Sequence, residues 1–214
     1  MMRGRRFQAA SLAIVGVVPL AGGCDGTLLS GFLVDGDVDP PPVVQTVLDD
    51  LTRFKAGDAE LTANQPGTVI DDLATLDGCW ATVFVDSSKP FNISLFEVYE
   101  FDAAANTFQR WSGLSNSAGE LWPLVPVISL ETGTYEVTGP AAIVLTDEHI
   151  LSNYNDSTGK VTSEFYEDEG FEPLDRPTLA TLDGDQMMFF IDAESAADID
   201  EAFRHSVHHQ FDCP

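Results

Sequence analysis

The stretch Leu76–Asp86, which reads LDGCWATVFVD, marks the point where the pattern of the chain changes. Upstream of it lie segments rich in Gly, Pro and Asp and segments with helical spacing. From Gly78 onward, apolar and polar residues alternate at every second position. This alternation predicts a β-strand with one buried face. We therefore place the start of a mainly β domain, spanning residues 77–192, at this stretch.

Short strand patterns follow one another downstream, separated by turn signals rather than by long helices. They lie at residues 92–102, 107–111, 124–130, 133–138, 141–146, 148–154, 160–167, 178–182 and 186–191. Gly139-Pro140, Asp156–Gly159 and Asp183–Asp185 are typical of hairpin turns. Sequential hairpins predict an up-and-down antiparallel β-barrel of about 8–10 strands, which removes exposed sheet edges by closing on itself. An open sandwich is the alternative.

Helices are predicted on both sides of this domain. In Val43–Ala56 apolar residues recur at helical spacing, and a shorter helical segment is expected at Val69–Leu76, so residues 43–76 form a helical N-terminal extension. Ser195–Gln210 is predicted to be a terminal helix within the segment 193–214, because Ile199, Phe203 and Val207 share a helical face. We expect both helices to pack outside the barrel.

The composition excludes one class of partner. The chain has 214 residues, of which 44% are hydrophobic, and it carries 35 Asp+Glu against 10 Lys+Arg, for a net charge of -25. A surface of this sign repels nucleic acid and anionic lipid headgroups, so we exclude DNA, RNA and electrostatic membrane docking. Solubility or a saline habitat explains the acidity, and cation scavenging is the alternative.

The N-terminus resembles a bacterial lipoprotein signal. Residues 1–23 combine a basic start with an apolar stretch that is short for a membrane span, and small residues precede Cys24 as in a lipobox. We predict that Cys24 is acylated and that it anchors an exported protein to a lipid bilayer, facing the periplasm or the exterior. Residues 24–42, acidic and proline-rich, are then a tether. The alternative is an ordinary cleaved signal that leaves Cys24 as a free thiol.

Two cysteines remain after lipidation of Cys24. An exported chain with Cys79 and Cys213 most simply forms one disulfide, which would tie the first strand to the last residues. Two free thiols are the alternative. A metal site is not favoured, because neither cysteine has a second one nearby.

Several motifs together resemble the lipocalin-like barrels found on bacterial lipoproteins. Gly78-Cys79-Trp80 is similar to the G-x-W signature of lipocalins, and it is followed in order by Tyr99–Asp102, Gly133–Val137 and Leu182–Met187. The resemblance implies that Trp80 packs at the closed end of a barrel. It also makes Arg204 a candidate for the arginine that usually accompanies this tryptophan.

A lipocalin-like barrel implies a ligand cavity or a filled interior. The candidate lining consists of aromatic residues on the strands, namely Trp80, Phe84, Tyr99, Phe101, Phe108 and Tyr135. We therefore expect a membrane-anchored envelope lipoprotein that binds or carries a small hydrophobic ligand. The alternative is a structural or protein-interaction module of the envelope, in which the same rings fill the barrel.

Metal-binding and catalytic patterns are weak. His205, His208 and His209 are three and four positions apart, but a helical wheel places them on the polar face, so we interpret them as solvated. Glu167–Glu169 and Glu172 are interpreted as a solvated acidic turn rather than a calcium site. Motifs for a nucleophile elbow, a phosphate loop or a zinc protease are missing from the sequence, so we predict no enzyme activity and no cofactor.

Overall fold

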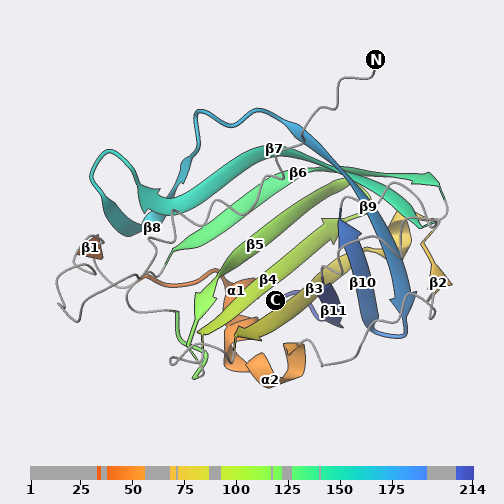
Figure 1. The fold of residues 1–214 in the computed structure, drawn as a ribbon, viewed down its shortest axis with the longest axis horizontal. Coiled ribbons are helices and arrows are strands. Elements are labelled where there is room, and N and C mark those ends of the chain that lie inside the picture. Colours follow the sequence, from red (N-terminus) through yellow and green to blue (C-terminus); the bar gives the residue numbers. More distant parts are fainter. Residues whose placement is uncertain are drawn as a thin grey trace, which may run out of the picture. The chain divides into compact units, whose positions relative to one another are not determined.

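The alternating pattern that begins at Gly78 forms a closed antiparallel ring of eight β-strands in the computed structural model (Figure 1). The strands are, in order round the ring, β3 (Gly78–Asp86), β4 (Ile93–Asp102), β5 (Thr107–Ser115), β6 (Ile128–Gly139), β7 (Ala142–Asn155), β9 (Leu174–Asp183), β10 (Gln186–Ile191) and β11 (Ser206–Phe211). Pairing of β7 with β9 and of β11 with β3 closes the ring. The predicted up-and-down barrel is confirmed.

The structure describes residues 33–34, 38–55, 68–70, 72–86, 93–116, 118–121, 127–139, 141–191 and 206–214. These residues belong to one compact unit, Gly31–Pro214. The predicted signal at 1–23, the acylation site Cys24, most of the tether and Arg204 lie outside the described residues. Predictions for these positions therefore remain predictions.

Three of the strands that the structure describes lie outside the ring. β8 (Lys160–Glu167) pairs with the second half of β7, and this hairpin projects past the ring in Figure 1. β1 (Leu33–Val34) pairs in parallel with the start of β8, and β2 (Thr68–Val69) pairs with β9. Because β8 lies outside the ring, the first half of β7 pairs directly with β9. The strands of the ring therefore still follow one another in chain order.

β6 and β7 are longer than predicted, because each joins two runs that the sequence separates. A register shift between Thr132 and Gly133 allows the pair to stay continuous through this point. A Cβ atom at Gly133 would lie 1.9 Å from the carbonyl oxygen of Thr146, so only glycine permits this approach of the two backbones. The turn predicted at Asp183–Asp185 joins β9 to β10, with Gly184 at a φ of 64°.

The predicted N-terminal helix is confirmed but divided. α1 (Pro42–Asp49) ends where Asp50 leaves the helical region, at φ -140° and ψ 61°. The Asp50 carboxylate then accepts a hydrogen bond from Arg53 N and caps α2 (Leu51–Phe54). Both helices bury their apolar side against the outer face of β3 and β4, as predicted for an element outside the barrel. None of the described helices has the length and apolar character needed to cross a membrane.

The shorter helical segment predicted at Val69–Leu76 is only partly right. Val69 belongs to strand β2, and a single 3₁₀ turn, η1 (Leu73–Thr75), follows after Asp72 accepts a hydrogen bond from Ala74 N. Leu76 and Ile70 are fully buried beneath the ring. The segment therefore covers one end of the barrel.

The terminal helix predicted over Ser195–Gln210 is wrong where the structure describes it. Residues 206–211 form strand β11, which fills the place between β10 and β3 and belongs to the ring. Val207 and Phe211 are buried on the outer face. Residues four apart share a face in a helix and also in a strand, so the spacing read as helical fits both. The barrel thus extends into the segment 193–214.

The predicted disulfide between Cys79 and Cys213 is confirmed, with a Cα–Cα distance of 5.4 Å across a sequence separation of 134. It lies beside the seam between β11 and β3, where the two strands share three register pairs, from His209 opposite Ala81 to Phe211 opposite Cys79. The disulfide therefore ties together the two strands at which the ring closes.

Candidate functional site

Strand alternation and pairing decide which side chains enter the ring. On β3, Cys79, Ala81 and Val83 pack with the helices, so Trp80 and Thr82 point inward. Residues directly opposite each other in an antiparallel pair share a face. The register therefore carries the inward face from Thr82 to Glu97 on β4 and onward round the ring.

The first inward level is an apolar floor at the end covered by Ile70 and Leu76. We use the name floor for the buried interior residues Trp80, Tyr99, Phe101, Phe108, Tyr135, Ile143, Leu145, Ala180 and Met187. Trp80 is 1% exposed, and its Nε1 donates a hydrogen bond to the Leu76 carbonyl at 2.8 Å. This end is therefore the sealed end of the ring.

The aromatic rings of the floor touch one another. Phe101 stacks on Tyr99 with centroids 5.4 Å apart and meets Tyr135 edge-on at 5.0 Å, and Phe108 lies 6.3 Å from both Tyr99 and Phe101. These separations are those of packed aromatic pairs. Five of the six aromatic residues predicted to line a cavity are thus brought together. They are buried in a packed core.

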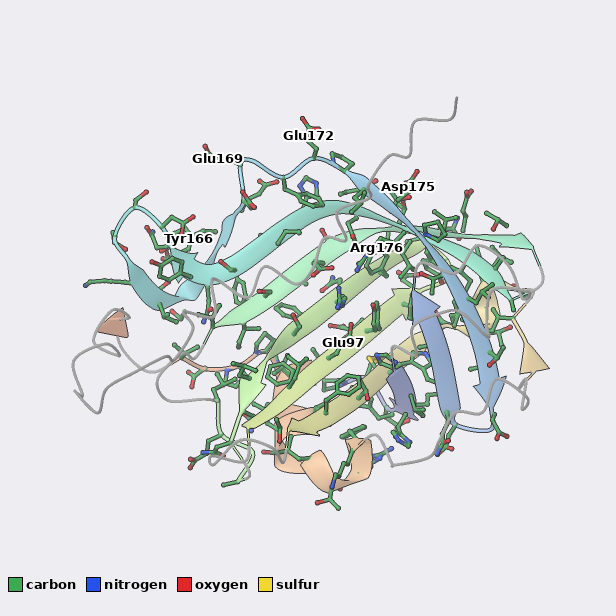
Figure 2. All side chains as sticks on the ribbon, in the orientation of Figure 1. Glu97, Tyr166, Glu169, Glu172, Asp175 and Arg176 are labelled. Carbon is green, nitrogen blue, oxygen red and sulfur yellow. A yellow bond between two sulfur atoms is a disulfide. The ribbon has the colours of Figure 1, made fainter. Side chains whose placement is uncertain are left out.

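The next inward level is charged. We use the name charged belt for Glu97 on β4, Arg110 on β5, Glu131 on β6, Asp147 on β7, Arg176 on β9 and His208 on β11. Arg110 Nε lies 2.5 Å from Glu97 Oε1, and its Nη1 lies 2.8 Å from Glu131 Oε2. Arg176 Nη2 lies 2.9 Å from Glu131 Oε2 and 2.6 Å from Asp147 Oδ1. Figure 2 shows Glu97 on β4 and Arg176 on β9.

His208 joins the charged belt to the floor. It is fully buried, its Nε2 lies 3.6 Å from Glu97 Oε2, and its ring meets Tyr99 edge-on at 5.2 Å. The Arg110 guanidinium lies 5.8 Å from the centre of the same tyrosine ring. Tyr99 therefore contacts floor and belt at once.

Burial perturbs the ionisation of this level. Loss of solvent raises the pKa of Asp147 above its ordinary value, although the adjacent Arg176 works in the opposite direction. Burial also raises the pKa of Tyr99. For Arg110, burial disfavours the charge, but Glu97 and its other neighbours more than offset this and the pKa is raised. The arginines therefore stay charged, whereas burial disfavours the charged form of Asp147.

Thr82 and Arg176 each carry a buried polar atom that has no hydrogen-bond partner among the described residues. These atoms are Oγ1 of Thr82, in a residue that is 0% exposed, and Nε of Arg176. Buried polar atoms in folded proteins are almost always paired with protein, water or ligand. Water or a polar group of a ligand could supply the missing partners of these two atoms.

Beyond the belt, inward side chains become partly exposed. Phe84, Leu95, Leu114 and Ser129 are all of intermediate exposure, in contrast to the buried floor. The Glu131 and Arg176 side chains keep 12% and 14% exposure, whereas Glu97 and Asp147 keep 4%. Solvent therefore reaches the belt from the end opposite the floor, which we call the open end. Phe84, the sixth predicted aromatic residue, lies here.

The interpretation of the histidines as solvated residues on one helix face is wrong for His208. His208 and His209 are adjacent on a strand, so they point to opposite sides of the ring, and His208 is buried rather than solvated. His205 lies outside the described residues. Among the residues that the structure describes, no group of three or more His, Cys, Asp or Glu side chains is arranged to hold a metal ion.

A separate depression of about 400 Å³ lies on the outside of the ring beside the disulfide. Its lining comprises Arg53, Gly78, Asp185, Gln210, Phe211, Asp212 and Cys213. None of these residues was predicted to bind a ligand; Cys213 was predicted only to form the disulfide. The depression is outside the barrel and does not meet the charged belt.

The comparisons add no family to this geometry. Neither protein-family models nor the sequences of curated proteins match this chain. The closed antiparallel barrel is compatible with a lipocalin-like fold.

Proposed function

We propose that this protein is a lipid-anchored binding protein of a bacterial cell envelope, with a lipocalin-like barrel that takes up a small molecule through its open end. The observation that carries the proposal is that buried polar atoms of Thr82 and Arg176 lack a partner among the described residues, at the level of a charged belt that solvent reaches from one side. The proposed role is binding or transport rather than catalysis.

The belt is costly as a structural feature, which favours a functional role. Removing charges from water costs several kcal/mol per ion, and a buried ion network is often no more stable than an apolar core of the same volume. Carboxyl groups whose pKa is perturbed, and which lie in an interior that solvent reaches, are found most often at functional sites. Glu97, Arg110 and Asp147 each keep no more than 6% side-chain exposure. We infer that a ligand gains from contact with this level.

The position of the belt changes the chemical class of ligand that we expect. The sequence predicts an apolar molecule held among aromatic rings, but those rings are packed together in the floor. Beyond the belt, the inward side chains of Phe84, Leu95 and Leu114 are apolar and partly exposed. A molecule with an apolar body among these three residues and a polar end at the belt fits both surroundings.

Native mass spectrometry of the full-length protein, extracted from its own membranes, tests the binding role. We expect a bound small molecule that dissociates when the barrel unfolds. A Leu114→Trp variant should lose it by filling the open end, whereas Thr107→Trp, exposed on the same strand, should keep it. A wild-type protein that is repeatedly free of any small molecule would overturn the binding role.

The anchor is tested separately. Acylation of Cys24 places the protein in the membrane fraction, and Cys24→Ser should release it into the soluble fraction. Retention of Cys24→Ser in the membrane would show that the attachment has another cause. Neither result affects the binding test.

The second candidate is a filled barrel that serves as a structural or interaction module. The packed floor favours it, because Trp80, Tyr99 and Phe108 are each no more than 1% exposed and leave that half of the ring occupied. It predicts that Leu114→Trp changes no binding property and that no small molecule is recovered.

A further inference from the structure

We propose that the Cys79–Cys213 disulfide is a site of thiol–disulfide exchange, at which a dithiol reductant unlocks the seam between β11 and β3. The two halves of this disulfide differ in accessibility. Cys79 is 0% exposed and packs with the N-terminal helices, whereas Cys213 is exposed and lines the outer depression of about 400 Å³. A thiol therefore approaches the bond from the side of Cys213. Exposed disulfides are more often labile or regulatory than buried ones.

The exchange takes two steps. A thiolate of the reductant attacks Sγ of Cys213, the bond between the two cysteine sulfurs breaks, and Cys79 leaves as a thiolate that takes up a proton. The second thiol of the reductant loses its proton and attacks the reductant sulfur of this mixed disulfide, which releases Cys213 as a thiolate that is protonated in turn. The protein gains two electrons and two protons, and the reductant is oxidised to its own disulfide.

The seam that the disulfide spans has little backbone pairing. Among the described residues, β11 shares three register pairs with β3 and four with β10. The other pairings of the ring each contain six or more. The disulfide adds a covalent link at the end of the shortest pairing, where Phe211 lies opposite Cys79. β11 is therefore the ring strand whose position depends most on a bond outside the sheet.

The contacts that brace β11 from outside do not replace this link. Phe54 of α2 meets Phe211 edge-on with ring centroids 5.2 Å apart, and Arg53 Nη2 donates a hydrogen bond to the Gln210 carbonyl at 3.1 Å. Arg53 is exposed, and water competes for such a hydrogen bond, so its net contribution is small. Both contacts join β11 to α2 rather than to β3. Reduction therefore leaves the seam itself with three register pairs.

Release of β11 reaches the interior of the barrel. His208 on this strand is fully buried, and its ring meets Tyr99 edge-on at 5.2 Å. Its Nε2 lies 3.6 Å from Glu97 Oε2 in the charged belt. When β11 leaves its place, this side chain leaves with it, and the inward face of β3 loses a neighbour. The reduced barrel thus gains a lateral opening beside the belt, in addition to its open end.

Hydrogen exchange followed by mass spectrometry tests this lock on the seam. The protein is the full chain with Cys24→Ser, compared before and after treatment with dithiothreitol in native buffer. We expect dithiothreitol to reduce the disulfide without denaturant, because Cys213 is exposed. The amides of residues 206–211 should then exchange at least about tenfold faster. Strand β5, which does not border the seam, is the internal control and should change by less than about twofold.

Three results would overturn the proposal. The first is a disulfide that dithiothreitol reduces only in the presence of denaturant. The second is exchange in β11 that stays within about twofold of its rate in the oxidised protein. The third is an equal rise in exchange in β11 and β5, because the disulfide would then stabilise the whole barrel instead of locking one seam.

Matched variants separate loss of the link from effects of the reductant. Cys213→Ser breaks the link and should show the fast exchange of β11 in the absence of dithiothreitol. Asp212→Ser, an exposed neighbour on the same tail, keeps the disulfide and should exchange like the parent protein until it is reduced. Slow exchange of β11 in a folded Cys213→Ser variant would contradict the lock.

Alkylation of the reduced parent protein with iodoacetamide is a second measurement, which does not require that variant to fold. Cys213 should react first because it is exposed, and Cys79 should react at the rate at which β11 is released. A Cys79 thiol that stays unreactive in native buffer after Cys213 is fully alkylated would show that the strand remains in place.

Discussion

The floor and the charged belt are consecutive levels of one ring, but they differ in what holds them together. The floor is sealed by Ile70 and Leu76 and gains free energy from apolar burial, with Trp80 at 1% exposure. The belt is nearly as buried, yet it consists of ions that bond to one another across strands. The floor therefore stabilises the barrel, whereas the belt keeps charged side chains inside it.

The largest expected effect is in the floor. Trp80→Ala should lower the free energy of unfolding by about 3–5 kcal/mol, because it leaves a cavity and removes the donor to the Leu76 carbonyl. Urea unfolding followed by circular dichroism measures the loss. Phe84→Ala, inward on the same strand but partly exposed, should cost less than about half as much. Equal losses at the two positions would mean that the two ends do not differ.

Breaking one member of the belt should cost nearly as much, for the opposite reason. Arg110→Met leaves Glu97 and Glu131 buried without a shared cation, so we expect a loss of about 3–5 kcal/mol in unfolding free energy. Arg53→Met is the control. That arginine is exposed, and its loss should cost less than about 1 kcal/mol. A loss at Arg110 no larger than that at Arg53 would contradict the description of the belt as a buried network.

Replacing part of the belt as a balanced set should largely restore stability. Glu97→Leu and Glu131→Leu, combined with Arg110→Met, leave only the Arg176–Asp147 pair. We expect the triple variant to unfold within about 1–2 kcal/mol of the wild type, although it should no longer bind the ligand. A triple variant less stable than Arg110→Met alone would show that the belt supports the fold in the way the floor does.

The smallest effect is on the pH dependence of stability. Burial raises the pKa of Asp147 in the folded state, so this carboxyl group binds its proton more tightly folded than unfolded. Its contribution to stability is present below the unfolded pKa of about 3.9 and is lost as the pH rises through the folded pKa. The stability of the wild type relative to Asp147→Asn should therefore fall as the pH rises from about 4. A difference that grows with pH would contradict the raised pKa.

Most of the fold could be predicted from the alternation of apolar and polar residues and from the turn signals. Alternation from Gly78 and turn signals such as Asp183–Asp185 predict consecutive antiparallel strands, and they favour a closed barrel over the open sandwich that is the alternative. β11 could not be predicted in this way, because Val207 and Phe211 fit a helix and a strand equally well. Strand is chosen over helix here because β10 and β3 each need a neighbouring strand to close the ring, and this need depends on the whole barrel.

The candidate site divides in the same manner. The aromatic floor could be predicted because its residues are large, apolar and on alternate positions. Glu97 lies on the face shared by Leu95 and Tyr99, so its inward position was available from the same alternation, but charged residues seldom point into a core. Its partners were not available. Arg176 meets Glu131 and Asp147 across 45 and 29 positions, and such pairings depend on register between distant strands.

The difference between the two ends of the ring can be measured directly by thiol labelling. Leu114→Cys and Leu145→Cys each add one inward thiol to the full chain with Cys24→Ser, at the open end and in the floor respectively. We expect Cys at position 114 to react at least about a hundredfold faster under native conditions, because the floor is reached only when the barrel opens. Equal labelling rates at the two positions would contradict a barrel sealed at one end and accessible at the other.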